Sequence, residues 1–352
     1  MRRRTIAALA ASVAAGALVV GIAVVWPGLD AQETPEASTS VWALQTGDGR
    51  RYARVNTAVG ELDTVRSISN PDAVVSSPAG VYLFSDSFSK ITRIDEALPA
   101  DLDEEALRAS DSTPPGTIDV AASGDRVAYL TDSGTVYVGI LGGEQPRALD
   151  PFPYTADAVA IDDRGVLFAY SRADASVLRY DIGRREVRGR AALEIDEIAA
   201  PAVPAAGDTW AVVDGESGRM WLRDAEDAPP LPATGAMTVA EPSSTAEEIY
   251  VATETALVRV APDGSGADIA FGTGATVLGI PARPIQRDGE VYAAWLPEGT
   301  GTGILWGSDA EPRTLDYGGE SLGDERRPVF VDGVGSIILN ETRSGWAWTV
   351  PD

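Results

Sequence analysis

The chain has 352 residues, with no cysteine, no histidine and a single lysine, and its formal net charge is -25 at pH 7. The lack of cysteine and histidine excludes disulfides, Cys or His metal ligands and a Ser–His–Asp catalytic triad. A chain this acidic, without a basic patch that contains aromatic residues, is not expected to bind nucleic acid, because phosphate groups would be repelled.

The N-terminus has the pattern of a membrane anchor. Residues 1–4 form a basic tail with three arginines, and residues 5–26 contain no charged side chain. A helix of that length spans about 33 Å, which is enough to cross the hydrocarbon core of a bilayer. No Lys or Arg follows until Arg50, so the positive-inside rule predicts a single-pass transmembrane helix with a cytoplasmic N-terminus and an extracytoplasmic remainder.

A cleaved signal peptide is the alternative interpretation of this segment. Signal peptides have a shorter apolar region, and the best cleavage site, after Ala31, has Leu29 where a small residue is needed. We therefore favour an uncleaved signal-anchor helix over 5–26. Residues 27–40 are polar and contain Pro, Ser, Thr and Glu, which predicts a flexible linker.

From residue 41 to 352, a short apolar β-prone run, a turn and a second such run recur eight times. The first runs begin at Val41, Val81, Val127, Val166, Thr209, Ile249, Val291 and Ser336. The spacing of 39 to 46 residues is typical of β-propeller blades, each a small antiparallel sheet. Immunoglobulin-like sandwiches need about 100 residues per module, and β-solenoid repeats are about 20–29 residues long. The sequence therefore predicts an all-β fold, a β-propeller, over 41–352.

Turn residues such as Thr46–Gly49 separate each first run from its partner. The partner runs are Tyr52–Val55, Ile91–Asp95, Val136–Ile140, Val177–Asp181, Met220–Arg223, Leu257–Val260, Gly303–Trp306 and Trp346–Val350. A third run, expected to line a central channel, precedes seven hairpins: Ala73–Val75, Ile118–Ala121, Ala158–Ile161, Ile198–Val203, Met237–Val239, Ile280–Ile285 and Val329–Val331. The hairpin at Val41 has none, so it either completes the last blade or belongs to an eighth. We expect seven blades, with eight as the alternative.

One segment breaks the strand pattern. Between Ile94 and Gly116, the residues Asp101–Arg108 combine an N-cap candidate, acidic first-turn residues and two leucines. This pattern predicts a short helix inserted between two blades.

Several motifs that suggest chemistry are better explained as turns or edges. Pro262–Asp268 has oxygen-bearing residues at alternate positions but lacks the bidentate glutamate of a calcium loop. Asp162–Gly165 and Asp332–Gly333 are interpreted in the same way, and Gly272–Thr276 lacks the rest of a phosphate loop. Arg184–Arg190 could face an acidic partner, but we favour a solvated blade edge that resists pairing. The sequence thus predicts no catalytic, cofactor-binding or metal-binding residue, and no cofactor.

Five segments carry a family resemblance: Met1–Thr5 with the Ala-rich span after it, Ser40–Gln45, Arg51–Val65, Leu315–Gly319 and Asn340–Trp346. Through them, nearly the whole chain resembles the N-terminal portion of large actinobacterial envelope proteins. Those proteins carry an anchor, a propeller-like region and tandem immunoglobulin-like or fibronectin type III domains. This chain departs from the family by stopping at Asp352, before any such module, and the resemblance implies no catalytic site.

Two functions follow as hypotheses. The first is a non-catalytic propeller, anchored in the cell membrane, that binds an envelope protein or glycan outside the cell. The alternative is an extracytoplasmic carbohydrate-active or calcium-dependent hydrolase that works through carboxylates, supported by fold analogy alone. Clustered buried carboxylates with a strongly raised pKa would favour the enzyme, whereas a channel lined by Ser, Thr and Ala would favour the binding module.

Overall fold

The computed structural model describes residues 40–149, 154–194, 198–223, 231–232, 237–299, 301–317, 325–333 and 335–350. The predicted tail and membrane helix, residues 1–26, lie outside the described residues, as does the predicted linker up to residue 39. Among the residues that are described, no helix is both long and apolar enough to cross a membrane. Thr39–Asp352 forms a compact unit of its own.

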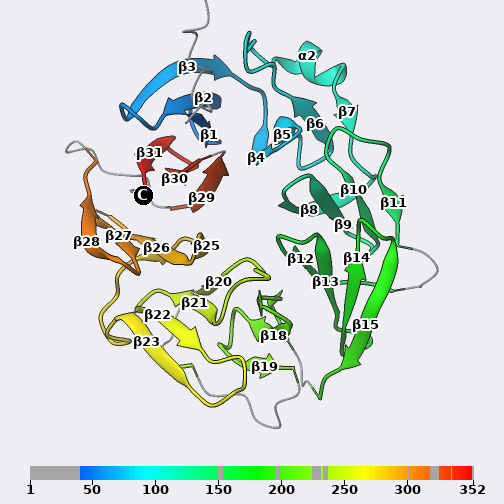
Figure 1. The fold of residues 1–352 in the computed structure, drawn as a ribbon. Coiled ribbons are helices and arrows are strands. Elements are labelled where there is room, and N and C mark those ends of the chain that lie inside the picture. Colours follow the sequence, from blue (N-terminus) through cyan, green and yellow to red (C-terminus); the bar gives the residue numbers. More distant parts are fainter. Residues whose placement is uncertain are drawn as a thin grey trace, which may run out of the picture. The chain divides into compact units, whose positions relative to one another are not determined.

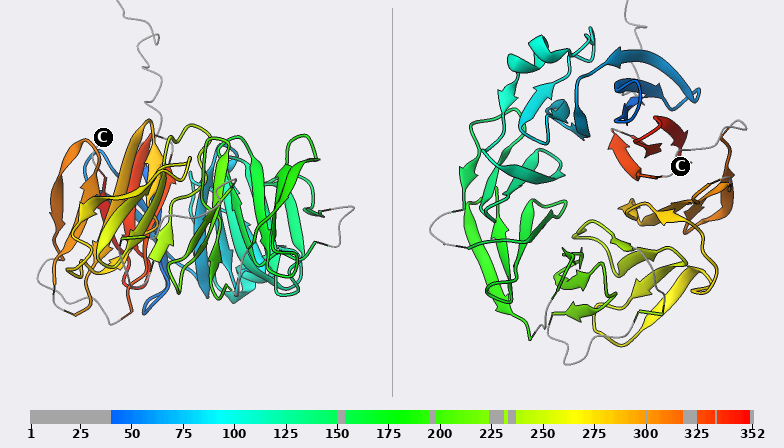
Figure 2. Two further views of the ribbon diagram at one scale, coloured as in Figure 1. Left: turned by 90° about the horizontal axis from the view of Figure 1, so that it is seen from below. Right: turned by 180° about the vertical axis from the view of Figure 1, so that it is seen from behind.

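Within the described residues, the strands of this unit form eight antiparallel sheets that stand radially around a common axis (Figures 1 and 2). The predicted propeller is confirmed, and the preferred count of seven blades is wrong. The hairpin at Val41 does not complete the last blade, because β1 (Ser40–Gln45) pairs with β2 (Arg51–Asn56) and β2 pairs with β3 (Glu61–Ser67). The sequence analysis did not recognise β3 as a strand, since most of its side chains are exposed and polar.

The remaining strands follow the order of the repeat. The innermost strands are β4 (Pro71–Ser77), β8 (Thr117–Ser123), β12 (Ala158–Ile161), β16 (Pro201–Ala202), β17 (Ala205–Ala206), β20 (Met237–Val239), β24 (Ile280–Pro281), β25 (Ile285–Arg287) and β29 (Pro328–Gly333). Within the part of the chain that the structure describes, the first blade has no innermost strand, and β1 occupies the position of its second strand. In the other blades the second strands are β5 (Gly80–Ser85), β9 (Arg126–Thr131), β13 (Val166–Ser171), β18 (Thr209–Asp214), β21 (Ile249–Thr253), β26 (Glu290–Leu296) and β30 (Ser336–Glu341). The third strands, after β2, are β6 (Lys90–Arg93), β10 (Val136–Ile140), β14 (Ser176–Asp181), β19 (Met220–Leu222), β22 (Ala256–Val260), β27 (Gly303–Gly307) and β31 (Trp346–Thr349). The outer strands, after β3, are β7 (Asp111–Ser112), β11 (Arg147–Ala148), β15 (Glu186–Ala192), β23 (Ala267–Gly272) and β28 (Ala310–Leu315).

The core of the ring lies between the blades. Among the described residues, buried side chains form eight clusters, and each cluster joins two neighbouring blades. The cluster that closes the ring packs Val41 and Ala43 of the first blade against Val331 and Ile338 of the eighth. A Cβ on Gly333 would lie 2.6 Å from Cγ2 of Val41, so the close approach of these two blades requires glycine there. Because each second strand is covered on both faces, it is apolar throughout, as the sequence pattern indicates.

The two faces of the ring differ in their turns. One face carries the turns between second and third strands and the connections between blades; we call it the connector face. There, backbone hydrogen bonds tie each turn to a neighbouring connection, for example from Asp86 N to Asn70 O at 2.9 Å and from Asp132 N to Gly116 O at 2.8 Å. The opposite face carries the turns between first and second strands and between third and fourth strands. Figure 2 shows the strands running between these two faces.

A buried polar residue ends the second strand in six blades. These residues are Ser85, Thr131, Ser171, Asp214, Thr253 and Glu341. The two carboxylates act as clamps: Asp214 accepts a hydrogen bond from Ala200 N at 3.0 Å, and Glu341 accepts one from Arg327 N at 2.8 Å. Each clamp ties a turn of the connector face to the preceding connection, which makes that face rigid.

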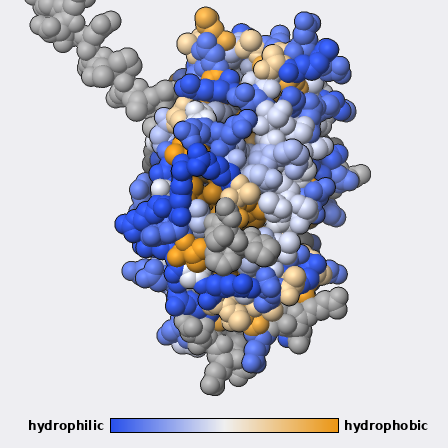
Figure 3. Space-filling model, turned by 90° about the vertical axis from the view of Figure 1, so that its right-hand side faces the viewer, coloured by the Kyte–Doolittle hydropathy of each residue, from blue (hydrophilic) through white to orange (hydrophobic). Residues whose placement is uncertain are grey.

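The predicted helical insertion is present, but the expected position between two blades is wrong: it lies within the second blade, between β6 and β7, and the sheet resumes after it. Its helix is α2 (Glu104–Arg108), and Asp103 caps it by accepting hydrogen bonds from Glu105 N and Ala106 N. The segment before the helix packs along the first blade, where Ala100 O accepts from the Tyr52 hydroxyl and Pro99 O accepts from Arg66 Nε. The flank of the ring shown in Figure 3 is mostly hydrophilic with scattered apolar residues.

Candidate functional site

The connector face carries a hollow of about 470 Å³ where the eighth, first and second blades meet. Its lining comes from four loops: the turn Thr46–Arg50, the connection Ser67–Ser69, the insertion at Leu102 and Asp103, and Arg343 in the last turn. A volume of this size lies within the range of small-molecule sites.

Backbone hydrogen bonds hold the walls of this hollow together. Gly47 N donates to Arg343 O at 3.0 Å, which joins the first blade to the eighth, and a Cβ on Gly47 would collide with that carbonyl oxygen. On the other side, Ile68 N donates to Arg50 O at 3.0 Å. The insertion is joined at Leu102, whose N–H donates to Ser67 O at 2.9 Å. The hollow is therefore a rigid part of the ring.

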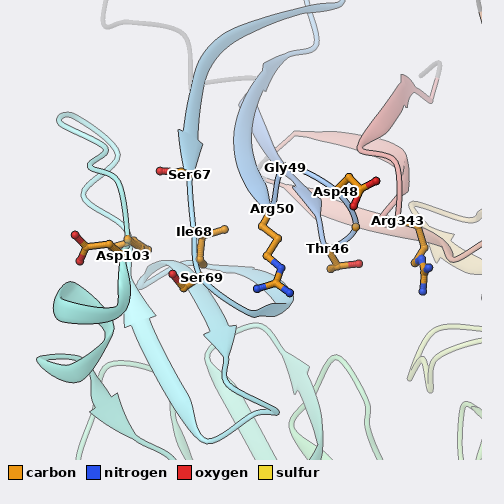
Figure 4. A pocket seen from close by; sticks show the side chains of 11 residues that line it. Thr46, Asp48, Gly49, Arg50, Ser67, Ile68, Ser69, Asp103 and Arg343 are labelled. Carbon is orange, nitrogen blue, oxygen red and sulfur yellow. The ribbon is translucent and has the colours of Figure 1, made fainter.

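Two arginines dominate the chemistry of the hollow. Figure 4 shows the Arg50 and Arg343 side chains extending in the same direction, with Thr46 between them, while the carboxylates of Asp48 and Asp103 point elsewhere. Nη1 of Arg50 donates to Oδ1 of Asn70 at 2.6 Å, and Nη1 of Arg343 pairs with Oε2 of Glu325 at 2.7 Å. The described partner of Arg50 is thus a neutral amide, which leaves its positive charge uncompensated by that contact.

The opposite face has two adjacent hollows of about 380 and 350 Å³ that share Arg287 and Asp288. Two glutamates in their lining, Glu248 and Glu290, have partners within the protein. The Tyr250 hydroxyl donates to Oε2 of Glu248 at 2.8 Å, and the Tyr292 hydroxyl donates to Glu290 in the same way. Both pairs arise from a Glu-x-Tyr sequence at the start of a second strand, in the sixth and seventh blades.

In the described part of the chain, three carboxyl groups have raised pKa values, and each lies on a different blade. Burial raises the pKa of Asp72 and of Asp162, although each also accepts a backbone N–H bond, from Phe88 and from Val166. Burial also raises the pKa of Asp332, against the effect of Arg287, which donates to it at 2.8 Å. The Asp332 side chain is still 54% exposed, so solvent screens its charge. Among the described residues, no group of three or more acidic side chains could hold a metal ion.

The motifs that the sequence analysis treated as turns are placed in turns or strand ends. Asp263 lies in the β22–β23 turn and accepts from Ser265 N at 2.9 Å, and Asp162 lies in the β12–β13 turn and accepts from Arg164 N at 3.0 Å. Thr273 closes a local turn by accepting from Thr276 N. These motifs are not brought together into one site.

The basic run Arg184–Arg190 lies on the β14–β15 hairpin at the outer edge of the fourth blade. Nη2 of Arg188 pairs with Asp181, and Nη2 of Arg190 lies 3.1 Å from Oδ2 of Asp174. Carboxylates of the same sheet therefore offset much of its charge, which supports a solvated edge over a partner-binding patch.

Sequence reasoning missed both arginines of the connector-face hollow. Arg50 follows a turn that was recognised, Thr46–Gly49, but nothing marks it as different from Arg51 beside it. Arg343 is separated from Arg50 by 293 positions, and only closure of the ring brings them to one hollow.

Comparison with solved structures identifies the class of fold. Streptogramin B lyase matches with a TM-score of 0.52 at 12% identity, over 80% of this chain and 93% of that one. A catalytically inactive virginiamycin B lyase from Staphylococcus aureus, solved with quinupristin, matches with a TM-score of 0.50 at 11% identity, over 80% of this chain and 95% of that one. BamB from Moraxella catarrhalis matches with a TM-score of 0.47 at 13% identity, over 89% and 91%.

At such low identities, the similarity establishes the β-propeller fold and nothing about activity. The class that fold and comparison define is therefore the β-propellers, here with eight blades in the described residues. No protein-family model matches the sequence, and no curated protein matches it either.

Proposed function

We propose that the chain is a non-catalytic binding module, held outside a bacterial cell by residues 5–26 as a membrane anchor, and that its connector-face hollow is the recognition site. The observation that carries this proposal is the combination of a rigid hollow of about 470 Å³ with an arginine whose charge is not offset by its Asn70 contact. Recognition sites in propellers benefit from such rigidity, because little conformational entropy is lost on binding.

The alternative of a carboxylate hydrolase has less support. Asp72 and Asp162 lie on different blades and each accepts a backbone hydrogen bond, and the Asp162 carboxylate also pairs with Arg164 at 3.7 Å. General acid–base work by a carboxylate pair needs two such groups facing one substrate. Fold similarity to lyases adds no support, because the inactive lyase variant has one histidine replaced by alanine, and this chain has no histidine at all.

Localisation and binding can be tested separately. For the anchor, the full chain is expected to stay with membranes after alkaline carbonate extraction, and a chain lacking residues 1–26 is expected to be released. Protease added to intact cells should digest the propeller region. Release of the full chain by carbonate, or protection of the propeller in intact cells, would contradict the anchored, extracytoplasmic arrangement.

For binding, the compact unit Thr39–Asp352 is mixed with cell-envelope fractions and sedimented. We expect saturable retention that excess unlabelled unit displaces, and no product release from a panel of envelope polysaccharides. Retention that cannot be saturated or displaced would argue against a binding module, and turnover of a polysaccharide would favour the hydrolase.

A further inference from the structure

We propose that the connector-face hollow binds an oxyanion, a carboxylate or phosphate group, at the guanidinium group of Arg50, with Arg343 as a second arginine in the lining of the same hollow. This inference rests on the proposed binding function and names the chemistry that its site recognises. Guanidinium groups suit this task, because their N–H donors match the oxygens of carboxylate and phosphate.

Both arginines keep donors free of their described contacts. The printed contact of Arg50 uses Nη1 toward the Asn70 amide, and that of Arg343 uses Nη1 toward Glu325. A guanidinium carries five N–H donors. Other N–H groups of each side chain therefore remain to contact a ligand, and the Arg50 contact, being with a neutral group, does not weaken its attraction for an anion.

The Arg50 guanidinium is held in place by a chain of hydrogen bonds. Arg50 donates to Oδ1 of Asn70 at 2.6 Å, and Nδ2 of Asn70 donates to Oδ1 of Asp86 at 3.0 Å. Backbone hydrogen bonds link the same segments, from Ile68 N to Arg50 O and from Asp86 N to Asn70 O. Asp86 is thus engaged with the amide instead of the arginine, and the amide orients the guanidinium without neutralising it.

Backbone strain accompanies this arrangement. Arg50, Asn70 and Asp86 have φ angles of 36°, 42° and 54°, and Ser87 and Phe88 continue the left-handed conformation. Non-glycine residues in this region are uncommon and each costs free energy. Five of the eight such residues in the described chain lie along this one chain of contacts or in the turn that continues it. These strained conformations lower the stability of the folded state, and they occur in the residues that hold the Arg50 guanidinium beside the hollow.

The rest of the lining suits a polar ligand. Thr46, Ser67 and Ser69 add hydroxyl groups to the lining; in Figure 4, Thr46 lies between the two arginines, and the hydroxyl groups of Ser67 and Ser69 point away from Arg50. Asp103 is occupied in capping α2, and Asp48 points away from the guanidinium groups (Figure 4). Since the whole chain carries a net charge of -25, it repels anions at a distance, so attraction must come from these local donors.

The test is titration of the unit Thr39–Asp352 with three sugars that differ at one position: glucose, glucuronate and glucose 6-phosphate. Saturation-transfer NMR is suited to the Kd on the order of 1 mM expected for so small a ligand. We expect the two charged sugars to bind and glucose not to bind. Raising the salt concentration should weaken binding, because it screens the charges.

Three variants assign the effect to the hollow. Arg50→Gln should lower the affinity for glucuronate by about tenfold, the effect of losing one charge-assisted contact. Arg343→Gln should lower it by less, because Glu325 already pairs with Arg343 at 2.7 Å. Arg51→Gln removes an equal charge from an exposed neighbour that does not line the hollow and should leave affinity unchanged. Equal binding of glucose and glucuronate, or an equal loss in Arg51→Gln, would overturn the proposal. Circular dichroism of each variant checks that the propeller is folded.

A vesicle arm distinguishes the source of the oxyanion. Sedimentation with phosphatidylglycerol vesicles but not with phosphatidylcholine vesicles, abolished by Arg50→Gln, would assign a lipid phosphate. Binding of the charged sugars without vesicle binding would assign a soluble or glycan-borne oxyanion. If Arg50→Gln and Arg343→Gln still bind envelope fractions like the unaltered unit, the oxyanion site is wrong and the proposed binding function stands.

Discussion

The hollows on the two faces of the ring are similar in size but differ in how their charges are used. On the connector face, Arg50 contacts a neutral amide, so its charge remains available beside a hollow of about 470 Å³. On the opposite face, around hollows of about 380 and 350 Å³, Glu248 accepts from Tyr250, and Arg287 pairs with Asp332 at 2.8 Å. Cavity volume therefore does not distinguish the two faces, whereas the contacts of their charged side chains do.

The stability of the two regions should also differ, and this is the largest effect we predict. Glu341 is 1% exposed and accepts N–H bonds from Arg327, Arg343 and Ser344. Glu341→Ala leaves those donors without their acceptor, so we expect it to lower the free energy of unfolding by about 3 kcal/mol. Urea denaturation measures this change.

Glu248→Ala on the opposite face is the matched control. Glu248 pairs with Arg259 at 3.4 Å, where both side chains are partly exposed to solvent, so its loss should cost no more than about 1 kcal/mol. If the two substitutions cost the same, the carboxylate clamps of the connector face are not the source of its rigidity.

The second prediction concerns which arginine side chains have a positive charge that can attract an anion. Arg287 lies at 2.8 Å from Asp332 and 3.5 Å from Asp288, so its charge is offset by carboxylates. Arg287→Gln should therefore leave the affinity for glucuronate within about twofold, whereas Arg50→Gln should lower it by about tenfold. A comparable loss in both variants, measured by the same NMR titration, would mean that anions are attracted by general charge and that the two faces do not differ.

The sequence predicts more of the fold than of the candidate site. Each second strand is covered on both faces by neighbouring blades, so the eight runs from Val41 to Ser336 stand out as apolar and β-prone. Outer strands such as β3 and β15 expose most of their side chains, and this weak pattern hid the strand that gives the first blade its own sheet. Arg50 and Arg343 become neighbours of one hollow only through ring closure, which no local pattern encodes.

The third prediction compares pH dependence. Asp162, in a turn of the opposite face, is 1% exposed, and burial raises its pKa above the ordinary value of 3.8. A raised folded pKa means that the folded state holds this proton more tightly than the unfolded chain does. The stability that this group contributes is therefore fully present below about pH 3.8 and is lost as the pH rises through the raised pKa.

Asp162→Asn keeps an oxygen that can accept the Val166 N–H bond but cannot ionise. The stability of the unaltered chain relative to this variant should fall as the pH rises from 3.5 to 7. Urea denaturation of both proteins at several pH values measures the difference. A difference that does not change with pH, or that changes in the other direction, would show that burial does not govern this carboxyl group.

The smallest effect tests whether the carboxylates of the opposite face are engaged within the protein. Burial raises the pKa of Tyr250, and its hydrogen bond to Glu248 raises it further, because the nearby negative charge disfavours the phenolate. Glu248→Gln removes that charge and should lower the pKa of Tyr250.

Tyr129 is the control for this change. Burial raises the pKa of Tyr129 to about 12 without a carboxylate partner, so Tyr129 should titrate as before. Ultraviolet titration of tyrosinate absorbance, with Tyr250→Phe to assign the signal, measures both groups. An unchanged pKa for Tyr250 would mean that Glu248 is not engaged by this tyrosine and has only its pairing with Arg259 at 3.4 Å.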